Sequence, residues 1–301
     1  MFYPVAVTSF TLPSFAKVNL MLCVVGRRDD GFHELFTVFQ SVSLHDSITF
    51  RDGERIELTC PNKSIPRDER NLIVKAAILL RERHGIDRGA AMHLTKRIPS
   101  PGGLGGGSSN AAVALIGLSR LWELDVPFED LLSVADELGS DVPFFLYGGT
   151  AIGTGRGNEI EPIPDVGAGN LLIITPNVRV STPDAFKRLG AQNLTSVDAE
   201  RILIVCRLEA EKLDPRQSDL VNDMEAAVFA AHPEIERVRG TLLDLGAANA
   251  MMSGSGASVF AVFEKEETRQ TAIKALDNEV NWRKFAVAAV SRDEYREKLG
   301  L

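Results

Sequence analysis

A glycine-rich stretch at residues 99–109 is the part of this sequence whose residue types point most directly to chemistry. It reads Pro-Ser-Pro-Gly-Gly-Leu-Gly-Gly-Gly-Ser-Ser, and five of the six residues at 102–107 are glycine. Glycine loses more backbone entropy on ordering than other residues, so this density indicates that the backbone turns through positive φ or closely approaches a ligand. Small helix-forming residues follow from Asn110, and Ser108 or Ser109 is the expected N-cap.

The same stretch predicts an anion-binding loop, most simply one for phosphate. The first N–H groups of a helix are unpaired and lie at the positive end of its dipole, which suits a bound anion. The loop is not a P-loop, because Gly-Lys-Ser/Thr is missing. The alternative is a flexible surface linker without a binding role. This is less favoured, because the stretch lies directly between an amphipathic strand and an alanine-rich helix.

A dinucleotide-binding core is disfavoured on two grounds. Ser108 stands where the dinucleotide fingerprint has its third glycine or alanine. The strand expected at 91–98 places His93, Thr95 and Arg97 on one face, whereas a parallel strand covered on both sides should be apolar throughout. A dehydrogenase is therefore a distant candidate.

Lys17 and Asn19 form a second candidate site, on a strand expected at 14–25. Apolar residues alternate from Ala16 to Val24, so Lys17 and Asn19 share the opposite face, about 7 Å apart. Periodicity alone favours the plain interpretation, in which this pair lies on the solvent side of an edge strand.

Three further residues have both a functional and a structural interpretation. Asp141 lies in a turn before an apolar run, where it could accept a hydroxyl proton or serve as a turn or cap residue. Phe32 and His33 follow a charged turn, where they could be core residues or a stacking platform for a flat ligand. Position does not decide between these.

Composition limits the function classes. The chain has 301 residues, 45% of them hydrophobic and 25% charged, with a net charge of −8. A chain with this net negative charge has no extended positive surface potential that would attract nucleic acid or an anionic membrane surface. An anionic ligand must therefore be held by the local geometry of its site. The three cysteines are far apart and odd in number, which predicts neither a disulfide framework nor a zinc site. We expect a cytoplasmic protein with reduced cysteines and no membrane span.

The expected elements divide the chain at 166/167, giving an N-terminal domain at 1–166 and a C-terminal domain at 167–301. Apolar periodicity predicts helices at 71–83, 110–124 and 128–138 in the first. The turn at Asp52-Gly53 predicts a hairpin of 46–51 with 54–60. Helices alternating with a few strands predict an α+β second half.

Three stretches together resemble the GHMP kinases. These are Pro-x-x-x-Gly-Leu-Gly-Gly-Gly-Ser-Ser-Asn at 99–110, Met-Ser-Gly-Ser-Gly-Ala at 252–257 and Phe-Ala-Lys-Val-Asn-Leu at 15–20. The resemblance runs nearly end to end. It implies a two-lobed α+β fold, with a ribosomal protein S5 domain 2-like N-terminal domain and a ferredoxin-like C-terminal domain.

Within the family, further motifs resemble members that act on a cytidine-diphosphate-linked methylerythritol. They include Arg-Asp-Asp-Gly-Phe-His at 28–33, Ser-Asp-Val-Pro-Phe at 140–144 and Gly-Thr-Gly-Arg-Gly at 153–157. The implied reaction is transfer of the γ-phosphoryl group of ATP, with Mg²⁺, to the 2-hydroxyl of that small molecule in non-mevalonate isoprenoid synthesis. The implied protein is a monomer or homodimer.

The resemblance also implies roles for individual residues. Asp141 resembles the general base, and Lys17 its partner, which holds the hydroxyl and the reacting phosphate and offsets charge as the phosphoryl group moves. Ser108 or Ser109 would lie near Mg²⁺. The residues implied to bind ATP are Pro99, Ser100, Pro101, Gly102, Gly103, Leu104, Gly105, Gly106, Gly107, Ser108 and Ser109 of the loop, with Asn71 and Lys96 lining the adenosine pocket.

The implied substrate contacts come from both halves of the chain. Phe32 and Phe186 resemble an aromatic sandwich around the cytosine base. The other implied substrate contacts are Asn19, His33, Thr182, Gly254 and Ser255.

Two departures from the family pattern stand out. The loop begins Pro99-Ser-Pro101 where Met and Gly are expected after the first proline, and Phe32 stands where tyrosine is common. Neither touches the implied chemistry. The rival interpretations are another GHMP kinase acting on homoserine or mevalonate, and a nucleotide-binding regulator without catalysis.

Overall fold

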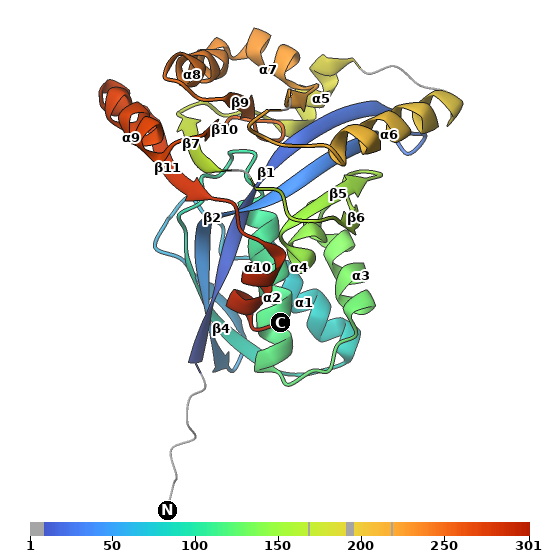
Figure 1. Ribbon diagram of the computed structural model, residues 1–301. Helices are drawn as coiled ribbons and strands as arrows, with labels where there is room; N and C mark the ends of the chain where they lie inside the picture. Colours follow the sequence, from blue (N-terminus) through green and yellow to red (C-terminus); the bar gives the residue numbers. More distant parts are fainter. Residues whose placement is uncertain (1–8, 168, 191–195, 218) are drawn as a thin grey trace, which may run out of the picture.

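The computed structural model describes residues 9–167, 169–190, 196–217 and 219–301 and shows two lobes joined by long strands (Figure 1). The lower lobe in this view contains the first half of the chain and the C-terminal helix. The upper lobe contains most of the second half. The expected two-lobed α+β architecture is confirmed.

The larger sheet has the order β3-β4-β2-β1-β8, and β5 and β6 extend it from β2. Its longest strands, β1 (Ser9–Arg27) and β2 (His33–Gly53), form an antiparallel pair that reaches from the lower lobe to beneath α6 (Figure 1). The other strands of this sheet are β3 (Ile56–Thr59), β4 (Gly89–Thr95), β5 (Thr150–Thr154), β6 (Glu159–Pro162) and β8 (Val221–Asn222).

The hairpin expected around Asp52-Gly53 is wrong. Strand β4 lies between the two segments, antiparallel to β2 and parallel to β3. The backbones are so close there that a Cβ atom on Gly89 would lie 2.4 Å from the Gly53 carbonyl oxygen. The Asp-Gly turn therefore marks a change of chain direction, but a more distant strand fills the position beside β2.

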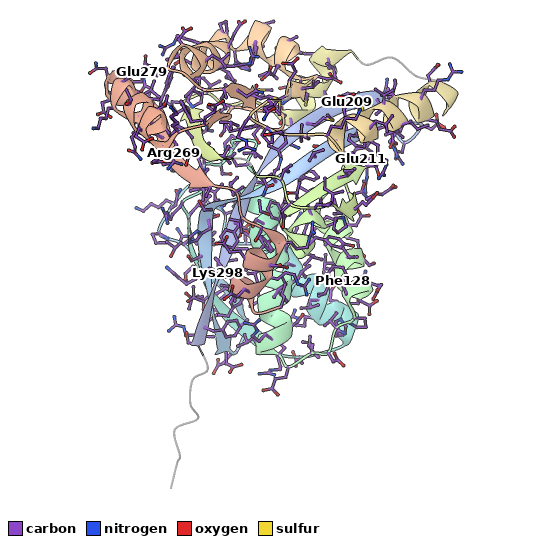
Figure 2. All side chains as sticks on the ribbon, in the orientation of Figure 1. Phe128, Glu209, Glu211, Arg269, Glu279 and Lys298 are labelled. Carbon is purple, nitrogen blue, oxygen red and sulfur yellow. The ribbon has the colours of Figure 1, made fainter. Side chains whose placement is uncertain are left out.

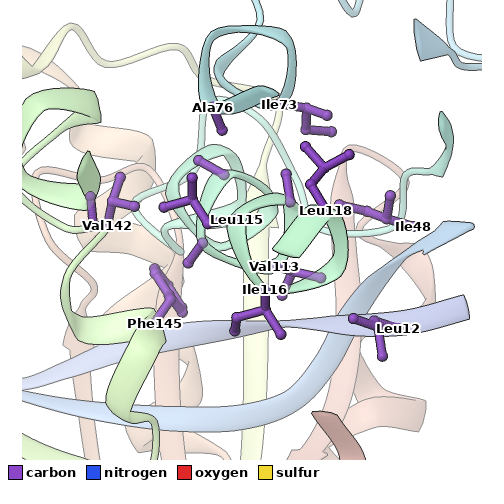
Figure 3. Packing of buried hydrophobic residues seen from close by; sticks show 14 of the residues in the cluster. Leu12, Ile48, Ile73, Ala76, Val113, Leu115, Ile116, Leu118, Val142 and Phe145 are labelled. Carbon is purple, nitrogen blue, oxygen red and sulfur yellow. The ribbon is translucent and has the colours of Figure 1, made fainter. Parts of the chain in front are cut away.

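Helix α2 (Gly106–Leu121) forms the centre of the lower lobe. Nearly all of its side chains are buried, and Figure 3 shows them between Ile73 and Ala76 of α1 on one side and Leu12 and Ile48 of the sheet on the other. The neighbouring helices are α1 (Leu72–His84), α3 (Phe128–Leu138) and the short α4 (Phe144–Tyr147). A helix buried on all sides is held firmly, which fixes the loop that precedes it.

The upper lobe is built on a four-stranded antiparallel sheet of order β11-β7-β10-β9. In chain order this is 4-1-3-2, the arrangement expected of a ferredoxin-like domain. Its strands are β7 (Asn170–Pro176), β9 (Asn249–Met252), β10 (Val259–Phe263) and β11 (Trp282–Ala288). Its helices are α5 (Thr182–Leu189), α6 (Ser196–Ala210), α7 (Glu225–Ala231), α8 (Pro233–Asp244), α9 (Glu266–Ala275) and a 3-10 turn at Leu276–Asn278.

The C-terminal helix α10 (Arg292–Leu299) returns to the lower lobe. Lys298 of α10 and Phe128 of α3 lie there, whereas Arg269 and Glu279 lie in the upper lobe (Figure 2). Tyr295 is fully buried against Gly148, and its hydroxyl donates to the Phe145 carbonyl at 2.7 Å. The division at 166/167 stays a prediction, and the last helix packs in the core of the first half.

In the described part of the chain, no helix combines the length and the hydropathy needed to cross a membrane.

Candidate active site

A cavity of about 740 Å³ lies between the two lobes. Residues from β1, the turn before β2, the glycine loop, the turn after α3 and helix α5 line it. Nine residues singled out as catalytic or substrate-binding from the sequence are among them: Lys17, Asn19, Phe32, His33, Asp141, Thr182, Phe186, Gly254 and Ser255. Side chains distant in sequence therefore meet at one site.

Lys17 and Asp141 form an ion pair at one end of the cavity. Lys17 Nζ lies 3.4 Å from Asp141 Oδ2, and the two side chains are 4% and 35% exposed. Lys17 also donates to Asn19 Oδ1 at 2.7 Å, and Asn19 Nδ2 donates to Thr37 Oγ1 at 2.8 Å. The ammonium is thus held in place while the carboxylate stays open to the cavity, which is what a proton acceptor for a bound hydroxyl requires.

The plain interpretation of Lys17 and Asn19 as solvent-facing is wrong. Strand β1 has neighbours on both edges, β2 and β8, and both of its faces are buried along this segment. Lys17 lies under the glycine loop, since a Cβ atom on Gly105 would lie 3.0 Å from Lys17 Cγ. The alternation of β1 describes its two faces correctly, but the face that carries Lys17 is covered by the glycine loop and by Gly254 of the second glycine motif.

The glycine loop forms a backbone cradle beside this ion pair. Gly103 and Gly105 have φ values of +72° and +67°. A Cβ atom on Gly103 would lie 2.0 Å from the Ser253 carbonyl oxygen, so the second glycine motif packs directly against the first. Ser253 Oγ donates to the Gly103 carbonyl at 2.9 Å, which locks the two loops together. Close backbone approach, rather than side-chain charge, shapes this phosphate-sized recess.

The N-cap of α2 is Gly105 and not Ser108 or Ser109 as expected. The left-handed φ of Gly105 lets the helix begin at Gly106, so both serines lie in its first turn. Ser109 is fully buried, with its hydroxyl 2.8 Å from Ser14 Oγ, whereas Ser108 is only partly buried. Ser108 is therefore the more accessible of the two hydroxyl groups. Among the described residues, no group of three or more His, Cys, Asp or Glu side chains is placed to hold a metal.

Asp46 is a buried carboxylate that sequence reasoning missed. Its oxygens accept from the backbone N–H groups of Arg97 and Ile98 at 2.6 and 2.8 Å, from Asn110 Nδ2 at 3.0 Å and from Lys96 Nζ at 2.5 Å. It therefore joins β2 to both ends of the glycine loop. The residues next to Asp46 in the sequence do not indicate this role, because its hydrogen-bond partners lie about fifty residues further along the chain.

The two residues expected around adenosine already have partners in the structure. Lys96 pairs with Asp46, and burial lowers the pKa of Lys96 while Asp46 opposes that shift. Asn71 caps α1 by accepting from the Ile73 N–H at 3.0 Å and donating to the Pro66 carbonyl at 2.7 Å. Neither residue lines the cavity between the lobes. Their adenosine contact stays a prediction.

The opposite end of the cavity is aromatic. His33 and Phe186 stack with ring centroids 4.8 Å apart and an interplanar angle of 17°. Burial, and then the charge of Arg27, lowers the pKa of His33, which favours the neutral ring, a form that can both donate and accept hydrogen bonds. Phe32 is 52% exposed and lies under the guanidinium of Arg156. Phe186 thus contacts His33 here, and a sandwich with Phe32 stays a prediction.

Helix α5 brings Phe186 and Thr182 to the site. Ser181 caps this helix and Pro183 occupies its first turn. Thr182 Oγ1 lies 2.6 Å from Ser255 Oγ of the second glycine motif. Asn222 is another residue that sequence reasoning missed. It supports the second glycine motif by donating to the carbonyls of Met252 and Gly254 at 2.8 and 2.9 Å.

The charge of the cavity is opposite to that of the chain. Of the charged residues that the structure describes, Lys17, Arg27, Arg156 and Lys187 line it together with one acidic residue, Asp141. The whole chain nevertheless carries a net charge of −8. Cationic side chains concentrated in a concave site favour a ligand with several negative charges.

We expect Gly103→Ala to disrupt the cradle. The new methyl group would overlap the Ser253 carbonyl, and alanine is disfavoured at φ +72°. The free energy of unfolding should fall by about 2–4 kcal/mol, measured in urea, and KM for ATP should rise. Gly240→Ala is the matched control, because it lies within α8 with no atom within 4 Å of the new Cβ. Equal stability of the two variants would contradict the close packing of the loops.

Comparisons with known proteins identify the family of the chain. The family description "GHMP kinases N terminal domain" matches residues 71–149, and "GHMP kinases C terminal" matches residues 208–281. The chain is 37% identical over 289 residues to the 4-diphosphocytidyl-2-C-methyl-D-erythritol kinase of Solibacter usitatus, covering 95% of this chain and 90% of that protein. It is 39% identical over 267 residues to the enzyme of the same name from Chlorobium phaeobacteroides, covering 88% and 92%.

Solved structures show the same fold. A crystal structure of a 4-(cytidine 5'-diphospho)-2C-methyl-D-erythritol kinase superposes with a TM-score of 0.75 at 33% identity, over 93% of this chain and 99% of that one. A homoserine kinase from Cytophaga hutchinsonii superposes with a TM-score of 0.69 at 22% identity, over 98% of each chain. The latter likeness shows a shared fold alone.

Proposed function

The chain belongs to the GHMP kinase family of ATP-dependent phosphotransferases, and from that premise we propose that it phosphorylates the 2-hydroxyl of 4-diphosphocytidyl-2-C-methyl-D-erythritol. The observation that carries the proposal is one cavity with a Lys17–Asp141 pair at one end and an aromatic cluster at the other. A nucleoside diphosphate joined to a small alcohol has chemistry that matches both ends. Its place would be in the non-mevalonate route to isoprenoids.

Asp141 is the proposed general base. Its carboxylate opens to the cavity and takes the proton of the substrate hydroxyl as that oxygen becomes bonded to phosphorus. Lys17, fixed by Asn19, stabilises the negative charge on the transferring group. The contribution of both residues is positioning and electrostatics, as in other phosphoryl transfers.

The glycine cradle is the proposed ATP-phosphate site, and its shape fits the group. A side chain at Gly105 would crowd Lys17 and one at Gly103 would collide with the second glycine motif, so the loop offers backbone N–H groups to the phosphates. Bound ATP would supply the phosphoryl group, and Mg²⁺ would neutralise its phosphates. Ser108 is the loop hydroxyl best placed to hold the metal.

The aromatic cluster is the proposed cytosine site. Phe186 and Phe32 both line the cavity and supply flat apolar surfaces, and the ring nitrogens of His33 supply hydrogen-bonding atoms for the base edge. Arg27 and Lys187 bring positive charge near a diphosphate. One face of the Phe186 ring is stacked on His33.

The direct test is release of ADP by purified protein with Mg-ATP, in the presence and absence of the cytidine-diphosphate alcohol. We expect strong substrate-dependent release. Release only with homoserine or mevalonate would reassign the substrate while keeping the kinase. ATP binding without release for any of these alcohols would favour a nucleotide-binding regulator.

We expect Phe186→Ala to raise KM for the cytidine substrate about 10-fold or more and to leave KM for ATP unchanged. Stacking of a base on an aromatic ring contributes about 1–3 kcal/mol, and alanine removes that surface. Phe128→Ala is the control, since Phe128 is a partly exposed ring that packs on Tyr147 away from the cavity (Figure 2). An equal rise in both KM values would refute the role of Phe186 in the base site.

A further inference from the structure

Phe32 is an aromatic side chain without an apolar environment. It is 52% exposed, in the turn between β1 and β2. Its backbone is fixed, because its carbonyl accepts from the Arg28 N–H at 2.8 Å and its N–H donates to Asp30 Oδ1 at 3.0 Å. A fixed backbone does not fix the ring, which can rotate between rotamers unless something packs against it. The side chain stacked on it is Arg156, with its guanidinium carbon 5.0 Å from the ring centroid.

Arg156 is itself held by two residues. Its N–H donates to Asn158 Oδ1 at 3.0 Å, and Nη2 lies 3.4 Å from Asp136 Oδ1 of α3. Asp136 also accepts from Asn158 Nδ2 at 2.7 Å. The backbone bond fixes the turn at Arg156 and the Asp136 contact orients the guanidinium, whose planar group can stack on an aromatic face as a flat surface.

The turn that carries Arg156 is tied to the turn that carries Phe32. The Leu35 N–H donates to the Gly155 carbonyl at 2.8 Å, and the Gly155 N–H donates to Glu34 Oε1 at 3.0 Å. Glu34 in turn pairs with Arg28 at 2.7 Å. Arg156 therefore contacts Phe32 from a fixed position, before any ligand is bound.

We propose that Arg156 is a positioning residue that fixes the Phe32 ring as one wall of the nucleobase site. The inference rests on the proposed function, because it assigns that wall to the cytosine base. A guanidinium on one face of the ring leaves the opposite face for stacking, and both residues line the cavity. Phe32 would then bind the base as a preorganised surface, without loss of ring freedom on binding.

A double-mutant cycle tests the inference, with the dissociation constant of cytidine diphosphate measured by calorimetry. We expect Arg156→Met to weaken binding about three- to tenfold. Arg156→Lys, which keeps the charge but not the planar group, should fall between wild type and Arg156→Met. In a Phe32→Leu background, Arg156→Met should have no further effect on binding, because the residue acts through the ring.

Arg237→Met is the matched control. Arg237 lies over the Trp282 ring at 4.3 Å in the upper lobe and does not line the cavity. It should leave cytidine diphosphate binding unchanged. If Arg156→Met weakened cytidine diphosphate binding as much in the Phe32→Leu background as in the wild type, the inference would be overturned, because Arg156 would then act on the ligand directly. Unchanged or tighter binding by Arg156→Met would also overturn it.

The kinetic constants separate this inference from the proposed function. Arg156→Met should raise KM for the cytidine substrate and leave kcat and KM for ATP unchanged. Wild-type protein that binds cytidine diphosphate in an Arg156-dependent manner but does not phosphorylate the alcohol would refute the proposed function and retain the inference. Wild-type protein that binds no cytidine diphosphate would refute the base site and the inference together.

Discussion

Asp141→Asn is expected to lower kcat by about 10²–10⁴-fold, the range that a general base contributes. Asparagine keeps the shape of the side chain, and its Oδ1 atom can still lie near Lys17 Nζ, which is 3.4 Å from the native carboxylate. An amide cannot accept the proton of the substrate hydroxyl at neutral pH. KM for ATP should stay within about twofold, because Asp141 does not belong to the glycine cradle. Steady-state kinetics with the cytidine substrate measure both quantities.

Asp52→Asn is the matched control for that substitution. Asp52 pairs with Arg88 at 3.0 Å on the surface and does not line the cavity. The Asp52→Asn substitution should therefore leave kcat unchanged. If Asp141→Asn retained most of its turnover, Asp141 would be a positioning carboxylate and the proton would leave by another route.

Lys17→Met is expected to lower kcat by about 10²–10³-fold, with the fold intact. The ammonium lies between the two glycine motifs and near Asp141, where negative charge moves between ATP and the substrate oxygen. Methionine fills a similar volume against Gly105 and the Phe39 ring, which lies 5.4 Å from Lys17 Nζ. Removing one partner of an ion pair is most destabilising when the other charge is left buried, but Asp141 is 35% exposed and can be solvated, so the melting temperature should fall only slightly.

Two variants distinguish the position of the charge from its mere presence. Lys17→Arg keeps the charge but needs more room than the space beneath Gly105 and Gly254 offers, so it should also be impaired. Lys284→Met removes a lysine that pairs with Asp277 at 2.6 Å outside the cavity, and it should retain full activity. Loss of folding in Lys17→Met would assign Lys17 a structural role instead.

Several features could be predicted from sequence because they depend on neighbouring residues. The glycine density at 102–107 predicts a backbone in the left-handed region, and Gly103 and Gly105 adopt it. Ser181 followed by proline predicts the start of α5, and α3 has the expected bounds of 128–138. Such signals arise within one or two turns of chain, so the rest of the molecule need not be known.

Local signals failed where a distant segment changed the outcome. Asp52-Gly53 has the residues of a hairpin turn, but β4 inserts beside β2 and pairs with it instead. Likewise the first turn of α2 offers two serines as caps, but Ser109 is drawn into the core by Ser14 from β1. Strand partners and buried hydrogen bonds are chosen by the free energy of the whole packed core, which no short window contains.

The sequence by itself thus determined the glycine cradle, the strand that presents Lys17 and Asn19, and the family resemblance that links them to Asp141. Only the tertiary structure decided that Lys17 is buried beside Asp141 and not exposed to solvent. The buried hydrogen-bond network of Asp46 was likewise visible only in the structure, because its four donors come from segments far along the chain. The physical reason is common to both cases: a charged side chain is tolerated in the interior only where partners from other segments satisfy it.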